Sequence, residues 1–122
     1  MVSKLFRVVF FIGVLAVIAL SVIPQEAKPD TGMSGKLNHI AAYAALALVG
    51  GIAFKRQRPL FMMVVGLLLL GAGLELVQAL LPSRFASGYD VLANMVGIAL
   101  GSAVAISTNT FMNRRSQILG LD

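Results

Sequence analysis

Eight polar side chains inside or beside long apolar runs are the residues of this sequence that could carry chemistry. An ionisable side chain costs about 2.5–3.5 kcal/mol at the centre of a membrane helix, so one that occurs there is expected to have a partner or a function. Six of the eight form pairs three or four residues apart, which places both members of each pair on one helical face. The pairs are His39 and Tyr43, Glu75 and Gln78, and Asp90 and Asn94; Lys36 and Arg84 complete the set.

Proton transfer and anion binding are the two kinds of chemistry that this set supports. His39 is the only histidine of the chain, and histidine is the side chain whose charge changes near neutral pH. Glu75 is a carboxyl that can exchange a proton with it, which makes His39 and Glu75 the candidate catalytic residues. Arg84 is the natural contact for an anion, because its planar guanidinium pairs with phosphate or carboxylate.

Each of these residues also has a purely structural interpretation. His39 can serve as a hydrogen-bonding group near a helix end, and Glu75 can form an ion pair with Arg84 or Lys36 that holds the helices together. Asp90 can act as the N-cap of its helix, and Arg84 can extend to the membrane interface. The side chains that would simply complete a hydrogen-bond network are Tyr43, Gln78 and Asn94.

Four apolar runs must position these residues, at 5–23, 37–54, 60–81 and 90–111. The chain of 122 residues is 58% hydrophobic and only 12% charged, with a mean hydropathy of +0.89, which is far from the composition of a soluble domain. About 20 residues at 1.5 Å each cross the hydrocarbon core of a bilayer. We therefore predict an all-α polytopic membrane protein, with one domain over residues 1–122 folded as a four-transmembrane-helix bundle.

The first apolar run has a second interpretation as a secretory signal peptide. Lys4 and Arg7 would form its basic region, and Ala19-Leu20-Ser21 resembles a cleavage site. Cleavage would leave three spans, whereas retention gives four. The family resemblance described below favours retention.

The distribution of basic residues predicts how the bundle is oriented. With four spans, the N-terminus, the turn at 55–58 and the C-terminal tail share one side, which carries seven of the ten basic residues. Because cytoplasmic loops hold the excess of Lys and Arg, we predict that both termini are cytoplasmic. All three polar pairs then lie in the outer leaflet; Glu75, six residues before Leu81, is roughly 9 Å below its helix end.

Small residues indicate how the helices approach one another around a shared polar site. Small side chains four residues apart let helix backbones come close in a membrane, where no hydrophobic drive exists between helices. The small residues are Gly66, Gly71, Ala72 and Gly73 in the third run and Gly97-x-x-x-Gly101 in the fourth.

The rest of the composition excludes several classes of function. The chain has no cysteine, which excludes disulfides, thiolate nucleophiles and cysteine metal sites. The net charge of +5 comes from basic residues that flank the apolar runs, where they contact anionic lipid, so no nucleic-acid partner is expected. We expect neither a metal nor another cofactor. The sequence leaves the oligomeric state open.

Four motif blocks together resemble the VanZ-like family of small bacterial membrane proteins. They are Lys36-Leu37-Asn38-His39-x-x-x-Tyr43, Glu75-x-x-Gln78, Pro82-x-Arg84 and Asp90-x-x-x-Asn94-x-x-Gly97-x-x-x-Gly101. They cover residues 36–101, and one departure is Gly35, where the family often carries an acidic residue. The resemblance implies a multi-pass protein of the bacterial cytoplasmic membrane with a role in resistance to the glycopeptide teicoplanin, but it implies no particular reaction.

Two functions from different classes remain open. The first is a binding protein whose outer-leaflet pocket, formed by the eight polar residues, takes an amphipathic or lipid-linked envelope ligand; teicoplanin, which carries an acyl chain, fits this description. The second is a membrane-embedded enzyme in which His39 and Glu75 act as an acid–base pair on a lipid-linked substrate. The absence of cysteine, of several histidines and of a phosphate loop favours the binding protein. A proton pathway is disfavoured, because the polar residues stop in the outer half of the bundle.

Overall fold

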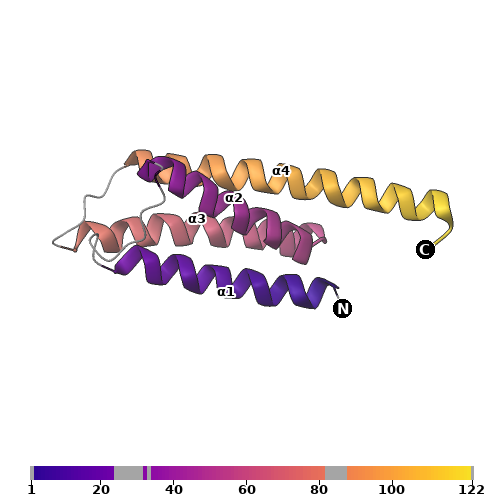
Figure 1. Cartoon of the computed structure of the whole chain (residues 1–122), viewed down its shortest axis with the longest axis horizontal. Helices are drawn as coiled ribbons and strands as arrows, with labels where there is room; N and C mark the ends of the chain where they lie inside the picture. Colours follow the sequence, from indigo (N-terminus) through magenta and orange to yellow (C-terminus); the bar gives the residue numbers. More distant parts are fainter. Residues whose placement is uncertain (1, 24–31, 33, 82–87, 122) are drawn as a thin grey trace.

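The structure, a computed structural model, describes residues 2–23, 32, 34–81 and 88–121. Its four helices are α1 (Val2–Val22), α2 (Gly35–Ala53), α3 (Gln57–Ala79) and α4 (Gly88–Leu119), and these residues contain no strand. All four helices are long and apolar enough to cross a membrane, and they lie side by side (Figure 1). The prediction of an all-α protein with four spans is therefore confirmed.

Local sequence explains several of the helix ends. Ser34 precedes α2 in an extended conformation, and its hydroxyl accepts a hydrogen bond from the Leu37 amide at 3.2 Å, which is the geometry of an N-cap. Pro59 stands in the first turn of α3, where its missing amide hydrogen costs nothing. Gly120 follows α4 with a φ of 65°, a left-handed conformation that glycine adopts without strain and that ends many helices.

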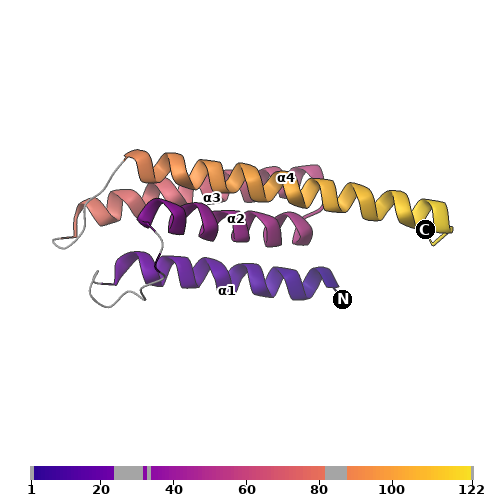
Figure 2. The same cartoon turned by 45° about the horizontal axis from the view of Figure 1, so that its top comes forward.

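α4 is the helix that departs most from its expected span of 90–111. It contains 32 residues, about 48 Å at 1.5 Å per residue, and its C-terminal part extends beyond the other helices (Figures 1 and 2). The apolar run ends near Phe111, but residues 112–119 contain neither Pro nor Gly, so nothing stops the helix before Gly120. Hydropathy marks the end of the apolar segment and not the end of the helix.

α2 and α4 form the closest helix pair of the bundle, because two glycines of α4 face the backbone of α2. A methyl group added at Gly97 would lie 2.5 Å from the Ile40 carbonyl oxygen, and one added at Gly101 would overlap the Ala44 carbonyl. The structure thus places the Gly97-x-x-x-Gly101 motif in a helix contact, as small residues in membrane helices allow.

The glycines of α3 differ from one another in what they face. Gly71 points into the bundle, because a methyl group there would lie 2.7 Å from Nδ2 of Asn94. Methyl groups at Gly66 and Gly73 would have no described heavy atom within 4 Å. The expectation that the whole small-residue run of α3 closes the bundle is therefore wrong for Gly66 and Gly73. Gly66 and Gly73 are seven residues apart, which is close to two helical turns, so these two glycines share one open face of α3.

α1 is the peripheral helix. It packs on α2 and α3, and it has no contact with α4 in the described part of the chain. Phe10 is its one buried residue, and this ring joins a core that includes Tyr43, Leu46 and Leu67. A helix that is apolar all round and mostly exposed is suited to a lipid environment.

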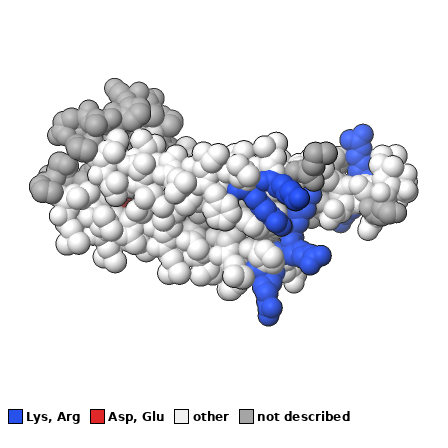
Figure 3. Space-filling view, turned by 90° about the horizontal axis from the view of Figure 1, so that it is seen from below, with Lys and Arg blue, Asp and Glu red and all other residues white. Residues whose placement is uncertain are grey.

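The two ends of the bundle differ in their charge. The start of α1, the turn between α2 and α3 and the end of α4 lie at one end of the molecule, here called the basic end (Figure 1). Lys and Arg side chains gather toward this end on the face that Figure 3 shows. The basic residues are Lys4, Arg7, Lys55, Arg56, Arg58, Arg114 and Arg115. The opposite end, where α2 and α4 begin and α3 ends, is here called the polar end.

Candidate functional site

Three helices bring the predicted polar pairs to the polar end. α2 and α4 start there and α3, which runs antiparallel to both, finishes there (Figures 1 and 2). Early positions of α2 and α4 therefore lie at about the same level as late positions of α3. The positions are His39 and Tyr43 on α2, Glu75 and Gln78 on α3, and Asp90 and Asn94 on α4.

The direct contact between pairs joins His39 and Asn94. Nδ1 of the imidazole lies 2.8 Å from Oδ1 of the Asn94 side chain. Oδ1 can only accept a hydrogen bond, so Nδ1 carries the proton and donates it. In the neutral ring the lone pair then stands at Nε2, and Nε2 receives no hydrogen bond from the described residues. The contact with Asn94 thus orients His39 and leaves it a basic nitrogen.

Asn94 is held in a tight space between α3 and α2. Its side chain is 3% exposed, and it lies against the bare backbone of Gly71. A methyl group at Gly71 would be 2.7 Å from Nδ2 of Asn94 and 3.4 Å from the hydroxyl oxygen of Tyr43. The absent side chain at Gly71 is therefore what lets Asn94 and the Tyr43 hydroxyl share this space.

Glu75 and Gln78 occupy the buried face of α3. Glu75 is 7% exposed and Gln78 is 5% exposed. Glu75 stands one turn after Gly71, whose backbone lies beside the Tyr43 hydroxyl of α2. Gln78 turns toward α1, where its Nε2 donates a hydrogen bond to the Ser21 carbonyl oxygen at 3.0 Å. All four helices thus contribute polar atoms at this end of the bundle.

Lys36 and Asp90 lie at the rim of the polar end and not inside it. Lys36 is exposed, and its Nζ lies 4.9 Å from the ring centroid of Tyr89, within the range of a cation–π interaction. Asp90 is partly exposed and stands in the first turn of α4, where a negative charge is favoured by the helix dipole. Because α4 already begins at Gly88, the interpretation of Asp90 as its N-cap is wrong.

The structure brings together five of the eight predicted residues. His39, Tyr43 and Asn94 are neighbours, with Glu75 beside Tyr43, and Gln78 is one turn further along α3. Arg84 lies outside the described residues.

Two expected pairings do not occur in the described structure. The hydrogen-bond partner of His39 is Asn94 and not Glu75, so the two candidate catalytic residues are not directly joined. Within the described residues, Lys36 forms no ion pair with Glu75. The Lys36 ammonium lies over the Tyr89 ring instead. A group of three or more potential metal ligands is also absent from the described residues.

Sequence reasoning did not include two groups that shape this site. They are the Ser21 carbonyl that accepts from Gln78 and the Tyr89 ring beside Lys36. Gly71 was predicted as a small residue at a helix contact, and the structure places its backbone against Asn94. The Ser21 carbonyl had no signal in the sequence, because a backbone acceptor can belong to any residue.

Four apolar spanning helices with buried polar side chains at one end define a polytopic membrane protein with a candidate site inside the bundle. The model of the VanZ/LLP1 family matches residues 3–111. That match covers most of the chain and all eight predicted polar residues, and the chain therefore belongs to the VanZ/LLP1 family. The resemblance noted from the four motif blocks is confirmed. No similar curated protein and no similar solved structure was found.

Proposed function

We propose that this protein binds an amphipathic, lipid-linked component of the bacterial envelope at the polar end of the bundle, in the outer leaflet of the cytoplasmic membrane. The observation that carries the proposal is the His39–Asn94 contact of 2.8 Å, with Asn94 against Gly71 of α3 and buried Glu75 one turn further along that helix. Polar groups on three different helices are costly to assemble in a membrane protein. Their assembly at one end is what a ligand with a polar head and an apolar tail requires.

The orientation of His39 indicates which groups such a ligand would present. Nε2 is a hydrogen-bond acceptor, so it suits a hydroxyl or amide donor of the ligand head. The Lys36 ammonium at the rim suits a phosphate or carboxylate. The two groups lie one turn apart on α2. A lipid-linked sugar phosphate carries both kinds of group, and its lipid tail can remain in the bilayer beside the helices.

The family resemblance suggests a second ligand for the same site, the glycopeptide antibiotic teicoplanin. Teicoplanin combines an acyl chain with hydroxyl and amide donors, so the same site would accept it at the membrane surface. We propose that such binding contributes to teicoplanin resistance in the cell.

A binding experiment with matched variants tests the proposal. The protein in phosphatidylcholine nanodiscs would be titrated with a polyprenyl-phosphate-linked sugar and, separately, with teicoplanin. Glu75→Gln keeps the size of the side chain and removes its charge, and His39→Gln removes the basic nitrogen. Each should raise the Kd for the better ligand by about tenfold or more, equivalent to about 1.4 kcal/mol, while the melting temperature stays near that of the parent.

Asn109→Ala is the control for these variants. Asn109 donates to the Gly51 carbonyl at 3.0 Å in the other half of the bundle, so its loss should lower stability and leave ligand affinity unchanged. If the affinity of every variant simply follows its folded fraction, the polar residues are structural and the proposal fails.

The enzyme alternative depends on the same basic nitrogen. Nε2 of His39 could accept a proton from a substrate hydroxyl, but the described structure does not join His39 to Glu75 as an acid–base pair. Hydrolytic release of the sugar or the sugar phosphate during the titration with the polyprenyl-phosphate-linked sugar would favour the enzyme. Binding without product favours the binding protein.

A further inference from the structure

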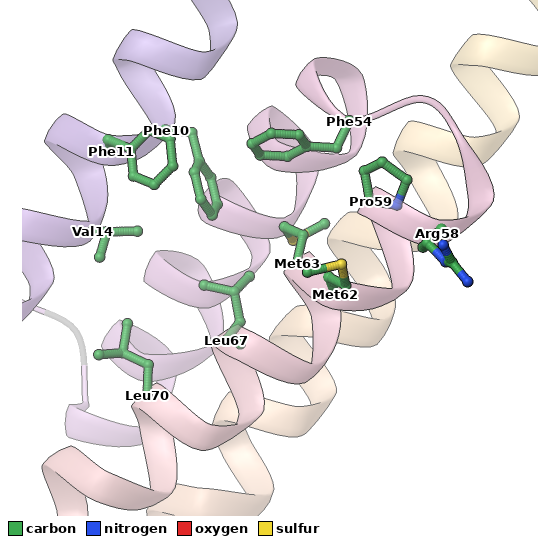
Figure 4. A pocket seen from close by; sticks show the side chains of 11 residues that line it. Phe10, Phe11, Val14, Phe54, Arg58, Pro59, Met62, Met63, Leu67 and Leu70 are labelled. Atoms are coloured by element: carbon green, nitrogen blue, oxygen red, sulfur yellow. The ribbon is translucent and has the colours of Figure 1, made fainter.

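A second candidate site lies in the half of the bundle that the polar residues do not reach. A groove of about 610 Å³ runs between α1 and α3 and is bounded at one side by the aromatic ring of Phe54, the residue that follows α2 (Figure 4). This α1–α3 groove is lined almost entirely by apolar side chains. The residues on which the argument rests are Phe10, Phe54, Arg58, Met62, Gly66 and Leu70.

The groove has the length of one membrane leaflet. Its lining on α3 runs from Arg58 to Leu70, which are twelve residues apart and therefore about 18 Å along the helix axis. The hydrocarbon core of a bilayer is about 30 Å thick, so this length is slightly more than one half of it. A transmembrane helix is 10–12 Å wide and would need roughly 1,400 Å³ over that length. The groove therefore fits an extended acyl chain better than a partner helix.

Positive charge is concentrated at one end of the groove. Arg58 is part of the lining, and its side chain lies beyond Pro59 with the guanidinium directed outward from the groove (Figure 4). Arg7 lies over the Phe54 ring, with its guanidinium carbon 5.5 Å from the ring centroid. The described acidic residues, Glu75 and Asp90, belong to the opposite, polar end. A negatively charged group at this end of the groove would thus meet the positive charge of the basic end, with Arg58 in the lining and Arg7 over the Phe54 ring of the lining.

We propose that the α1–α3 groove is a binding site for an anionic phospholipid of the leaflet at the basic end. One acyl chain lies in the groove, between Phe10 on α1 and Leu70 on α3. The phosphate lies at the basic end of the groove, where the long side chains of Arg58 and Arg7 turn toward it and pair their planar guanidinium groups with its oxygens. This site is separate from His39 and Asn94, so the proposal can be tested independently of the function proposed for the polar end.

Gly66 provides a way to block the groove without disturbing the helix contacts. Gly66 lines the groove, and a methyl group there would meet no described heavy atom within 4 Å. Gly66→Leu therefore places apolar volume where the acyl chain would lie. Gly73→Leu is its matched control, because Gly73 is equally open and on the same helix but does not line the groove.

Native mass spectrometry of the detergent-solubilised full chain tests the proposal. The chain would be titrated with a phosphatidylglycerol and, in parallel, with a phosphatidylcholine of the same acyl chains. We expect bound phosphatidylglycerol in clear excess. Gly66→Leu should weaken that binding by about tenfold or more, since at least two methylenes lose their burial. Arg58→Gln and Arg7→Gln should each weaken it by about fivefold.

The controls decide between a defined site and general attraction to the basic end. Gly73→Leu and the double variant Arg114→Gln/Arg115→Gln should bind phosphatidylglycerol as the parent does. The proposal is overturned if the two lipids bind equally, or if Gly66→Leu binds like Gly73→Leu. It is also overturned if the tail arginines matter as much as Arg7 and Arg58, or if Gly66→Leu abolishes a dimer peak rather than a lipid adduct. Circular dichroism melting confirms that each variant is folded.

Discussion

At the scale of single residues, the hydrogen-bond partner of His39 decides the chemistry of the polar end. The spacing of the motifs placed His39 and Tyr43 on one helical face, and Glu75 and Gln78 on another, and both inferences depend only on helix geometry. It did not decide whether His39 would face Glu75 or Asn94, because that depends on how each helix is rotated about its axis. The structure pairs His39 with Asn94, which fixes the tautomer of the ring.

Substitution of Asn94 by Leu should show how much the contact between His39 and Asn94 contributes to stability and how much it contributes to ligand binding. The variant keeps a side chain of similar size but leaves Nδ1 of His39 without its acceptor. We expect a loss of stability of about 0.6–1.7 kcal/mol, from the average to the maximum measured for interhelical hydrogen bonds in a membrane protein, and a weaker affinity for the polyprenyl-phosphate-linked sugar. Thermal unfolding in detergent and the titration in nanodiscs measure these two effects. An unchanged affinity would show that the orientation of His39 does not matter for binding.

At the scale of helices, glycines determine which elements come together. The sequence predicted that Gly97 and Gly101 would lie in a helix contact, and they do, but it did not distinguish them from Gly66 and Gly73, which face outward. A spacing pattern identifies residues on one face of a helix and carries no information about what that face meets. The end of α4 was missed for a similar reason, since hydropathy follows lipid exposure and not backbone hydrogen bonding.

Gly101→Ala tests the contact between α2 and α4. The added methyl group would overlap the Ala44 carbonyl, and overpacking of this kind costs about 1–3 kcal/mol. Gly66→Ala is the comparison, because its methyl group meets open space and alanine is the better helix former, so we expect a neutral or slightly stabilising effect of up to about 1 kcal/mol. Unfolding in detergent, followed by circular dichroism, should show a clear loss of stability for Gly101→Ala and no loss for Gly66→Ala. Equal effects would mean that α2 and α4 do not pack as described.

At the scale of the whole molecule, the arrangement has two chemically different ends. The start of α1 and the end of α4 lie at the basic end (Figure 1), and the buried polar side chains lie at the other. The number of spans and the separation of the two ends could both be predicted from hydropathy and the placement of charge along the chain. The direct contacts that complete the polar end could not, since they depend on the packing of helices far apart in the sequence.

The positive-inside rule predicts the orientation of this arrangement in the membrane. With seven of ten basic residues on the side of both termini, a reporter fused after Asp122 should be cytoplasmic, and one inserted within residues 24–35 should be external. Paired alkaline phosphatase and green fluorescent protein fusions measure this. A cytoplasmic signal from residues 24–35 would place the polar end in the inner leaflet and would exclude an envelope ligand there.

In the proposed function, His39 is oriented by Asn94 and offers Nε2 to a ligand at the polar end. Because His39 is the only histidine of the chain, ¹⁵N-histidine labelling gives a magnetic resonance spectrum from this one side chain, without assignment, in phosphatidylcholine nanodiscs. We predict a ring protonated at Nδ1, with an Nε2 resonance that shifts when a polyprenyl-phosphate-linked sugar or teicoplanin is added, and with no shift on addition of phosphatidylglycerol. A ring protonated at Nε2 would contradict the geometry, and an Nε2 resonance indifferent to both ligands would contradict the function.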